Sequence, residues 1–170
     1  MIVIRQEQSG DQPGIRQVNE QAFGQPQEAD LVDKLRQNCP QVHSLVADSD
    51  GEIVGHILFS PVQIDNVNVK IEGIGLGPMA VLPNLQRQGI GIVLVNTGLE
   101  NLRKEGCPFV VVLGHPDYYP RFGFQPASDY GLRCIWDVPE GVFQVFVMNE
   151  SILSGVTGLV HYRHEFSELG

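Results

Sequence analysis

The sequence predicts a single α+β domain spanning residues 1–170, and three patterns support this fold class. Apolar residues recur every three or four positions near the N-terminus and again in the middle of the chain, which is the spacing of helices. Between these regions lie alternating or continuous apolar runs, which are typical of strands. The composition, 42% hydrophobic and 18% charged, is that of a globular protein able to bury a core without disulfides or metal.

The first quarter of the chain is predicted to form a short strand and two helices. Residues 2–4 are the strand, and residues 11–23 are a helix with Ile15, Val18 and Ala22 on one face. Residues 24–26 (GQP) interrupt that helix. A second helix then ends before Cys39, because Pro40 follows.

A strand-rich block is predicted for residues 43–81. Residues 43–47 and 53–64 are apolar and flank an Asp-Gly pair at residues 50–51, a strong hairpin signal because these residues tolerate positive φ. The chain turns again at residues 65–66. Residues 67–71 alternate between apolar and polar as a half-exposed strand does, and the chain stays extended over residues 74–81.

The second half of the chain starts with a predicted helix over residues 90–105. Its apolar stripe is followed by Gly106, a residue type favoured just beyond a helix end. Residues 109–113 form a continuous apolar run, which indicates a strand covered on both faces. Further strands are predicted over residues 143–148 and 159–162, and the last of these is interpreted as an edge strand available for pairing.

Composition excludes several classes of function. Asp and Glu number 20 against 11 Lys and Arg, so the net charge is −9. No nucleic-acid partner is expected, because phosphates are bound by clustered basic residues, whereas a cationic amine suits an acidic chain. No apolar run approaches the roughly 20 residues that span a bilayer, and the apolar start is too short for a signal peptide. We therefore expect a cytoplasmic protein with no membrane role.

The cysteines and histidines predict no metal site. Cys39, Cys107 and Cys134 have no CxxC spacing and are interpreted as reduced thiols. His161 and His164 are three residues apart, which on a strand places their side chains on opposite faces. That arrangement is unsuited to sharing a metal ion.

The junction before the central helix carries the strongest functional signal. A helix start leaves about four N–H groups without partners, and a Ser, Thr, Asp or Asn usually caps one of them. Here Gln86, Arg87 and Gln88 precede the helix, and Gly89 and Gly91 lack β-carbons where a ligand would approach the backbone. Bare amides beside an arginine indicate a phosphate or pyrophosphate site. The alternative is that the two glycines only permit a tight turn.

Two other phosphate-binding motifs are excluded. The chain has no GxxxxGK[ST] motif of P-loop NTPases. Residues 73–77 (GIGLG) have the wrong glycine spacing for a dinucleotide-binding motif, and Pro78 stands where its helix would begin. We interpret that run as an irregular, bulged strand.

Residues 86–91 (QRQGIG) resemble the Q/R-x-x-G-x-G/A signature of the GNAT superfamily of acetyl-CoA-dependent N-acetyltransferases. Residues 79–83 are similar to the strand that enters this loop in the family. Residues 118–124 (YYPRFGF) resemble the family's Y-x-x-x-G-F segment, and one helix and one strand separate the two motifs, as in the family. The likeness covers residues 2 to about 147 and is closest to small bacterial acetyltransferases.

This resemblance implies a GNAT-like mixed, mostly antiparallel central sheet, splayed between its two central strands and flanked by helices. The core would be residues 1–147, with residues 148–170 as a C-terminal strand extension. Acetyl-CoA would be the co-substrate, with no metal. Its pantetheine arm would pair with the backbone of Met79, Ala80 and Val81, and its pyrophosphate would lie on the amides of the loop that ends at the helix start, for which the candidate residues are Gln86, Arg87, Gln88, Gly89, Ile90 and Gly91.

The resemblance also places Tyr119 where the family has the general acid that protonates the departing thiolate. A phenol suits this role because it is protonated at neutral pH. The alternative is that Tyr119 is a wall residue packed against the cofactor, with Tyr118 as the neighbouring candidate.

The general base is left open between three sources. The position where several relatives carry a Glu is Gly75 in this chain. Glu72 would substitute if the strand is bulged, and His115, at the end of a buried strand, is a second candidate. A chain of waters to bulk solvent would need neither.

The predicted reaction is transfer of an acetyl group to a primary amine by direct attack in a ternary complex. The acceptor would be a small-molecule or peptide amine, and the protein a monomer or homodimer. The alternative is a non-catalytic acyl-CoA-binding or regulatory module on the same fold, which the missing carboxylate at Gly75 favours. An acyl donor longer than acetyl also stays open.

Overall fold

The computed structural model describes residues 1–66 and 70–169, and it divides into two compact units. The first unit contains residues 1–60, 77–100 and the stretch from 164 onwards, and the second contains residues 61–76 and 101–163. Three elements have residues in both units: strand β3 (Glu52–Asp65), strand β4 (Lys70–Val81) and helix α3 (Ile90–Lys104).

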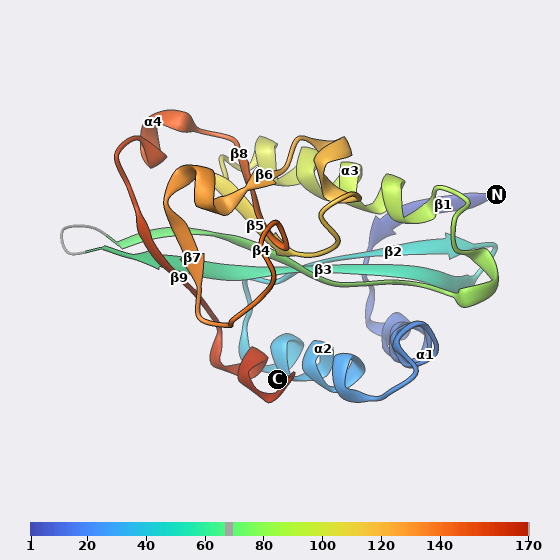
Figure 1. Cartoon of the computed structure of the whole chain (residues 1–170). Coiled ribbons are helices and arrows are strands. Elements are labelled where there is room, and N and C mark those ends of the chain that lie inside the picture. Colours follow the sequence, from blue (N-terminus) through green and yellow to red (C-terminus); the bar gives the residue numbers. More distant parts are fainter. Residues whose placement is uncertain (67–69, 170) are drawn as a thin grey trace. The chain divides into compact units, whose positions relative to one another are not determined.

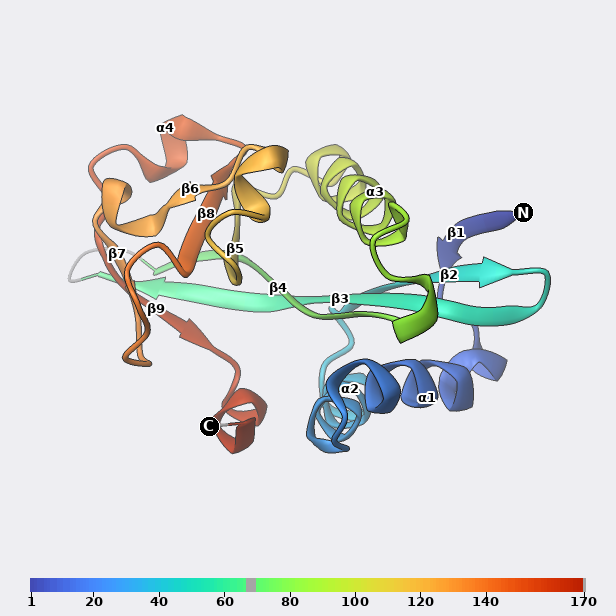
Figure 2. The same cartoon turned by 45° about the vertical axis from the view of Figure 1, so that its right-hand side comes forward.

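The first unit is a sheet covered by helices on both faces. Strand β1 (Ile2–Gln6) pairs antiparallel with β2 (His43–Ser49), and β2 pairs antiparallel with β3. Helices α1 (Gln12–Phe23) and α2 (Gln27–Asn38) lie on one side of these strands and α3 on the other (Figures 1 and 2). The short 3₁₀ helices are η1 (Ser9–Asp11), η2 (Pro83–Leu85) and, at the C-terminus, η5 (His164–Leu169).

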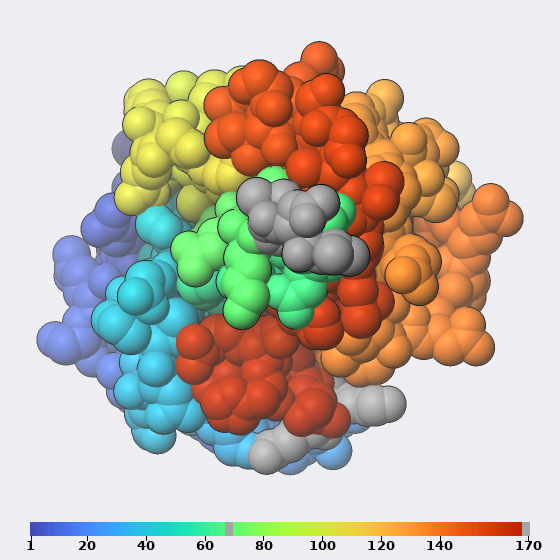
Figure 3. Space-filling model, turned by 90° about the vertical axis from the view of Figure 1, so that its left-hand side faces the viewer, coloured from blue at the N-terminus to red at the C-terminus, as the bar shows by residue number. Residues whose placement is uncertain are grey.

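Two glycines let α3 approach β3 closely. A β-carbon on Gly98 of α3 would overlap the ring of Phe59, and one on Gly55 of β3 would lie 3.1 Å from Ile90 and Leu94 side chains. Helix and strand therefore pack at a distance that larger residues would prevent. On the other side, η5 packs against α2, and Figure 3 shows these C-terminal residues in red next to the blue and cyan segment.

A buried polar chain connects α1 and α2 to the strands beneath them. The Asn19 amide donates to Ile15 O at 3.0 Å and lies 3.2 Å from His56 Nδ1, which therefore accepts. His56 Nε2 then donates to Ser44 Oγ at 2.9 Å, and that hydroxyl donates to Glu7 at 2.6 Å. Arg36 of α2 closes the chain with a two-pronged contact to Glu7, its Nε lying 2.6 Å from Oε2.

The second unit is a mixed sheet. Residues Ile74–Leu76 of β4 pair in parallel with β5 (Phe109–Leu113), and β8 (Phe143–Val147) pairs antiparallel with both β5 and the short β6 (Gln125–Pro126). Strand β9 (Gly158–Tyr162) pairs antiparallel with β3 and in parallel with β7 (Leu132–Cys134). The helical turns of this unit are η3 (Tyr119–Phe122), η4 (Ala127–Tyr130) and α4 (Glu150–Leu153). Its apolar core consists of Val62, Ile64, Phe109, Val111, Ala127, Leu132, Phe143, Val145, Leu153 and Val160.

The sheet opens along β4. Pairing between β4 and β5 stops at Leu76, and among the described residues no β5 partner continues opposite Gly77–Val81. One backbone edge of β4 is therefore free of strand partners over residues 77–81. The predicted α+β class with a mostly antiparallel, splayed sheet is confirmed.

Most predicted elements are confirmed to within one or two residues. The prediction that residues 159–162 form an edge strand is wrong, because β9 has a strand on each side. The predicted strand over residues 67–71 lies partly outside the described residues, since β4 begins at Lys70. Among the described helices, none is long and apolar enough to cross a bilayer.

Candidate active site

Residues 86–91, which are the end of the connection from β4 and the first two residues of α3, are here called the glycine loop. The backbone at Gln86 is extended, with φ −67°, whereas Arg87 has φ 64° and Gly89 has φ 91°. Left-handed residues that alternate with right-handed or extended ones turn successive N–H groups toward one side, which creates an anion-binding concavity. Arg87 is not a residue type that adopts this conformation readily, so its strain points to a functional site.

The helix start behind the glycine loop has no side-chain cap within the described part of the chain. Gln86 and Gln88 send their amides backwards, to Val81 O at 3.0 Å and Asn84 O at 3.5 Å. The Arg87 side chain is exposed and makes no ion pair with any described residue. The predicted combination of bare amides and an uncommitted guanidinium is therefore present in the structure.

A cleft of about 690 Å³ lies beside the glycine loop but is chemically unlike it. Leu82, Pro83 and Asn84, which lead into the loop, form one wall. The other walls carry the carboxylates of Asp11 and Glu52, and none of the described residues that line the cleft is basic. Phosphate groups are therefore suited to the glycine loop and not to this cleft.

Tyr119 begins η3 in the second unit and is only 8% exposed. Its ring makes edge-to-face contacts with Tyr118 and Phe124, at centroid distances of 5.0 and 5.5 Å. Burial raises the pKa of Tyr119 above its ordinary value. The phenol is therefore fully protonated at neutral pH and able to donate a proton but not to accept one.

Tyr118 is held differently. The Arg121 guanidinium lies over the Tyr118 ring, with its Cζ atom 4.4 Å from the ring centroid. Arg121 Nε also donates a hydrogen bond to Tyr118 O at 2.8 Å. Both tyrosine rings also contact Phe122, at centroid distances of 5.5 Å for Tyr118 and 6.1 Å for Tyr119, and Tyr119 is the more deeply buried of the two.

The two candidate bases lie in different settings. Glu72 is exposed on β4, and alternation along an extended strand puts it on the face opposite to Gly75. His115 is 71% exposed at its side chain, and its Nδ1 accepts the backbone N–H of Asp117 at 3.1 Å. The neutral imidazole therefore carries its proton on Nε2, and Nδ1 is already engaged.

Gly75 is covered by side chains from neighbouring strands. A β-carbon there would lie 2.9 Å from Tyr162 Cε2 and 3.0 Å from Val62 Cγ1. Tyr162 is in turn packed against Trp136, with ring centroids 5.2 Å apart. A carboxylate at residue 75 would not fit while these side chains are in place.

Sequence reasoning missed two residues that hold the turn after β5. Gly114 lies directly under the Tyr119 ring. Gln144 is buried in β8 and donates to His115 O at 3.3 Å and Gly114 O at 3.5 Å. A signal for Gln144 was present, because it is the single polar residue of the otherwise apolar strand FQVFV.

The structure presents the predicted site residues as separate sets. Met79, Ala80 and Val81 continue into the glycine loop along one stretch of the first unit. His115 and Tyr119 belong to one turn of the second unit, where Tyr118 N donates to His115 O at 3.1 Å. Glu72 belongs to strand β4. Among the described residues, no three His, Cys, Asp or Glu side chains are placed to hold a metal ion.

The fold is that of an acetyltransferase, and comparison with known sequences agrees. The sequence profile of the acetyltransferase (GNAT) domain matches residues 3–127. The chain belongs to the GNAT family of N-acetyltransferases. It is 38% identical over 167 residues to the uncharacterized N-acetyltransferase YhbS of Escherichia coli, covering 98% of this chain and 99% of YhbS. It is also 39% identical to the E. coli protein YjhQ over 160 residues, covering 90% of this chain and 86% of YjhQ.

Two solved structures are similar to most of the chain. E. coli YhbS in complex with CoA has a TM-score of 0.92 at 38% identity, with 99% of this chain and 93% of that one covered. A GNAT acetyltransferase from Brucella melitensis in complex with acetyl-CoA has a TM-score of 0.81 at 36% identity, with 98% of each chain covered. These matches confirm the predicted family and fold class.

Proposed function

We propose that this chain is a single acetyltransferase domain that moves an acetyl group from acetyl-CoA to a primary amine by direct attack in a ternary complex. The observation that carries the proposal is the glycine loop, whose bare amides and uncommitted arginine suit a pyrophosphate. The solved relatives with bound CoA and acetyl-CoA support it.

Each part of the cofactor has residues suited to it. The pyrophosphate is assigned to Gln86, Arg87, Gln88, Gly89, Ile90 and Gly91. The pantetheine amides are assigned to the backbone of Met79, Ala80 and Val81, because that edge of β4 has no β5 partner. An extended arm with alternating donors and acceptors pairs with such an edge as a strand does.

Tyr119 is assigned the role of the general acid. The leaving thiolate is basic, and burial keeps the Tyr119 phenol protonated at neutral pH by raising its pKa. Glu72 and His115 remain the candidate bases, and a water chain is the third route. His115 Nδ1 already accepts the Asp117 N–H, and Glu72 is exposed on β4. Both observations favour a chain of waters as the base.

A second candidate function is acyl-CoA binding without catalysis. The observation that favours it is the covering of Gly75 by Tyr162 and Val62, which leaves no room for a carboxylate base on that part of β4. Binding of acetyl-CoA without thiol release across a panel of amines would select this candidate.

Titration calorimetry with acetyl-CoA tests the cofactor assignment. Gly89→Glu is expected to abolish binding, because the new side chain fills the loop and repels the pyrophosphate. Gly89→Ala is the matched control, since it carries the same backbone strain at φ 91° without the bulk or charge. Equal binding by the Glu and Ala variants would show that the pyrophosphate lies elsewhere.

A thiol-release assay against small amines and peptides tests the reaction. Turnover is expected with wild-type protein, and Tyr119→Phe is expected to lower it by about 100-fold or more with little change in acetyl-CoA affinity. An unchanged rate in the Phe variant would remove Tyr119 from the acid role.

A further inference from the structure

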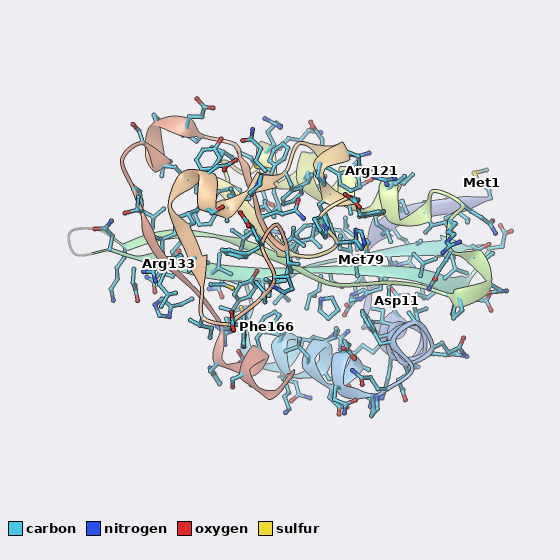
Figure 4. The ribbon with its side chains drawn as sticks, in the orientation of Figure 1. Met1, Asp11, Met79, Arg121, Arg133 and Phe166 are labelled. Carbon is cyan, nitrogen blue, oxygen red and sulfur yellow. The ribbon has the colours of Figure 1, made fainter. Side chains whose placement is uncertain are left out.

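Strand β1 forms an open edge of the first unit. Among the described strands it pairs only with β2, and the strand order begins with it. Figure 4 labels Met1 at the free end of this strand. An unpaired edge presents a row of backbone N–H and C=O groups to another chain.

The hydrogen bond from Glu7 N to Ser44 O, at 3.0 Å, shows which groups point outward. In an antiparallel ladder, residues that bond to the neighbour alternate with residues that do not. Glu7, Arg5 and Val3 therefore bond toward β2, and the backbone groups of Ile2, Ile4 and Gln6 point away from it. Of these, only Gln6 O already has a partner, Arg5 Nη1 at 3.1 Å.

The edge lacks the usual protection against pairing. Residues 2–6 contain no Pro or Lys, and the β1–β2 register has no bulge. Ile2 is 41% exposed and Val3 50% exposed. The single charge of the strand, Arg5, is turned back onto Asp11 and Asp48 at 2.7 and 3.1 Å.

We propose that the outer edge of β1 pairs antiparallel with β1 of a second copy of this chain, with Ile4 opposite Ile4 of the partner copy. The two copies are then related by a two-fold axis through this pair, and a ladder of hydrogen bonds joins them. The contact is isologous, since each copy offers the same strand.

Charge and hydrogen bonding select this register. With Ile4 on the axis, all three outward residues find partners, because Ile2 lies opposite Gln6 of the other copy. Arg5 then lies opposite Val3 of the other copy, so no like charges meet. Moving the axis to Arg5 would place two guanidinium groups opposite each other, and moving it to Val3 would leave both Gln6 residues unpaired.

The same register gathers the apolar side chains. Ala47 lies opposite Ile4 on β2, and its β-carbon is next to Gly55 on the face covered by α3. Ile2 and Ile4 therefore lie on that face, where they meet Ile4 and Gln6 of the second copy. A five-residue ladder buries less than a standard interface, so we expect a dissociation constant of about micromolar or weaker.

Two substitutions at Val3 test the contact by sedimentation velocity over a concentration series. Wild-type protein is expected to shift from the 18.8 kDa mass of one chain toward twice that mass. Val3→Glu places a carboxylate opposite Arg5 of the other copy and should tighten the dimer, whereas Val3→Lys should weaken it. With two such pairs per dimer, each shift should be about 2- to 30-fold. Equal behaviour of the two variants, or a single-chain mass throughout, would overturn the proposal.

Cysteine crosslinking tests the register without relying on the dimer's stability. Hydrogen-bonded antiparallel pairs have Cα atoms about 5.5 Å apart, which a disulfide spans. Ile4→Cys should form linked dimers on mild oxidation. Gln6→Cys is the matched control and should not link to itself, but a mixture of Ile2→Cys and Gln6→Cys proteins should link. Equal self-linking of the Ile4 and Gln6 variants would refute this register, and thermal melting confirms that each variant is folded.

Discussion

The ring of Tyr119 lies directly against the Cα of Gly114, so closely that a β-carbon at residue 114 would overlap the ring. Gly114 directly follows strand β5, and its carbonyl accepts from Gln144 at 3.5 Å. The position of the proposed acid therefore depends on a residue that has no chemistry of its own.

Gly114→Ala is expected to displace Tyr119 and to lower turnover by about 100-fold, because a shift of roughly 1 Å in a catalytic group has that effect. Acetyl-CoA affinity measured by calorimetry should change little. Gly10→Ala is the control, since a β-carbon there meets nothing within 4 Å. Full activity in Gly114→Ala would mean that turnover does not depend on the position in which Gly114 allows the Tyr119 ring to lie.

Arg87 combines a strained backbone with a charge, and substitutions separate the two. Arg87→Gly should raise the melting temperature, because glycine adopts φ 64° without the strain of about 1 kcal/mol that arginine bears. It should also weaken acetyl-CoA binding about 10-fold through loss of a charge-assisted hydrogen bond.

Arg87→Lys keeps the charge and should retain most of the affinity for acetyl-CoA. Gln88→Gly, which adds backbone freedom without removing charge, controls for flexibility of the glycine loop. If Arg87→Gly binds acetyl-CoA as tightly as the wild-type protein does, the guanidinium does not contact the cofactor.

Ser60 and Ser44 should respond in opposite ways to the same change. Ser60 Oγ is buried, and among the described residues it has no hydrogen-bond partner, so Ser60→Ala should stabilise the protein by about 1 kcal/mol. Ser44→Ala should destabilise it by about 1–3 kcal/mol, because buried His56 Nε2 loses its acceptor and Glu7 loses one of its donors. Urea unfolding measures both, and a destabilised Ser60→Ala would indicate a partner for that hydroxyl.

Acid should weaken the first unit through His56. Burial lowers the pKa of His56 from 6.5 to about 4, with nearby Arg36 acting in the same direction and Glu7 against it. The unfolded chain therefore binds a proton at higher pH than the folded chain does. The free energy of unfolding should fall by about 3 kcal/mol as pH drops from 6.5 to 4.

Chemical unfolding at a series of pH values checks this prediction. Burial alone would raise the pKa of Glu7, but hydrogen bonds from Arg36 and Ser44 bring that pKa below its ordinary value. The stabilisation that ionised Glu7 contributes to the folded state is therefore lost only below about pH 4.5. His56→Gln should lose stability at neutral pH and flatten the profile between pH 6.5 and 4. If the free energy of unfolding of His56→Gln falls as steeply between pH 6.5 and 4 as that of the wild-type protein, groups other than His56 cause the fall.

Local patterns were sufficient for helices α1, α2 and α3 and for most strands. The apolar stripe of α3 and the continuous run of β5 depend only on residues close in sequence, and these residues experience the same periodic environment. The missing cap before α3 is likewise visible in residues 86–88, because capping is a short-range interaction.

Pairing between distant strands was not visible in the same way. Residues 159–162 have the pattern of a half-exposed strand whether one neighbour is present or two, so the edge assignment of β9 failed. The covering of Gly75 by Tyr162 requires residues 87 positions apart to be brought together. The buried chain from Arg36 to Asn19 joins four elements and Glu7, and these segments have no common sequence signal.

By itself the sequence determined the α+β class, because periodicity acts over a few residues. Its two motifs, residues 86–91 and 118–124, identified the family by resemblance, and the missing cap and the glycines predicted a loop that suits a pyrophosphate. Only the tertiary structure decided which side chains cover Gly75, what positions Tyr119 and which backbone edge stays open at β1. These features follow from strand register and close packing, and both depend on contacts between segments far apart in the chain.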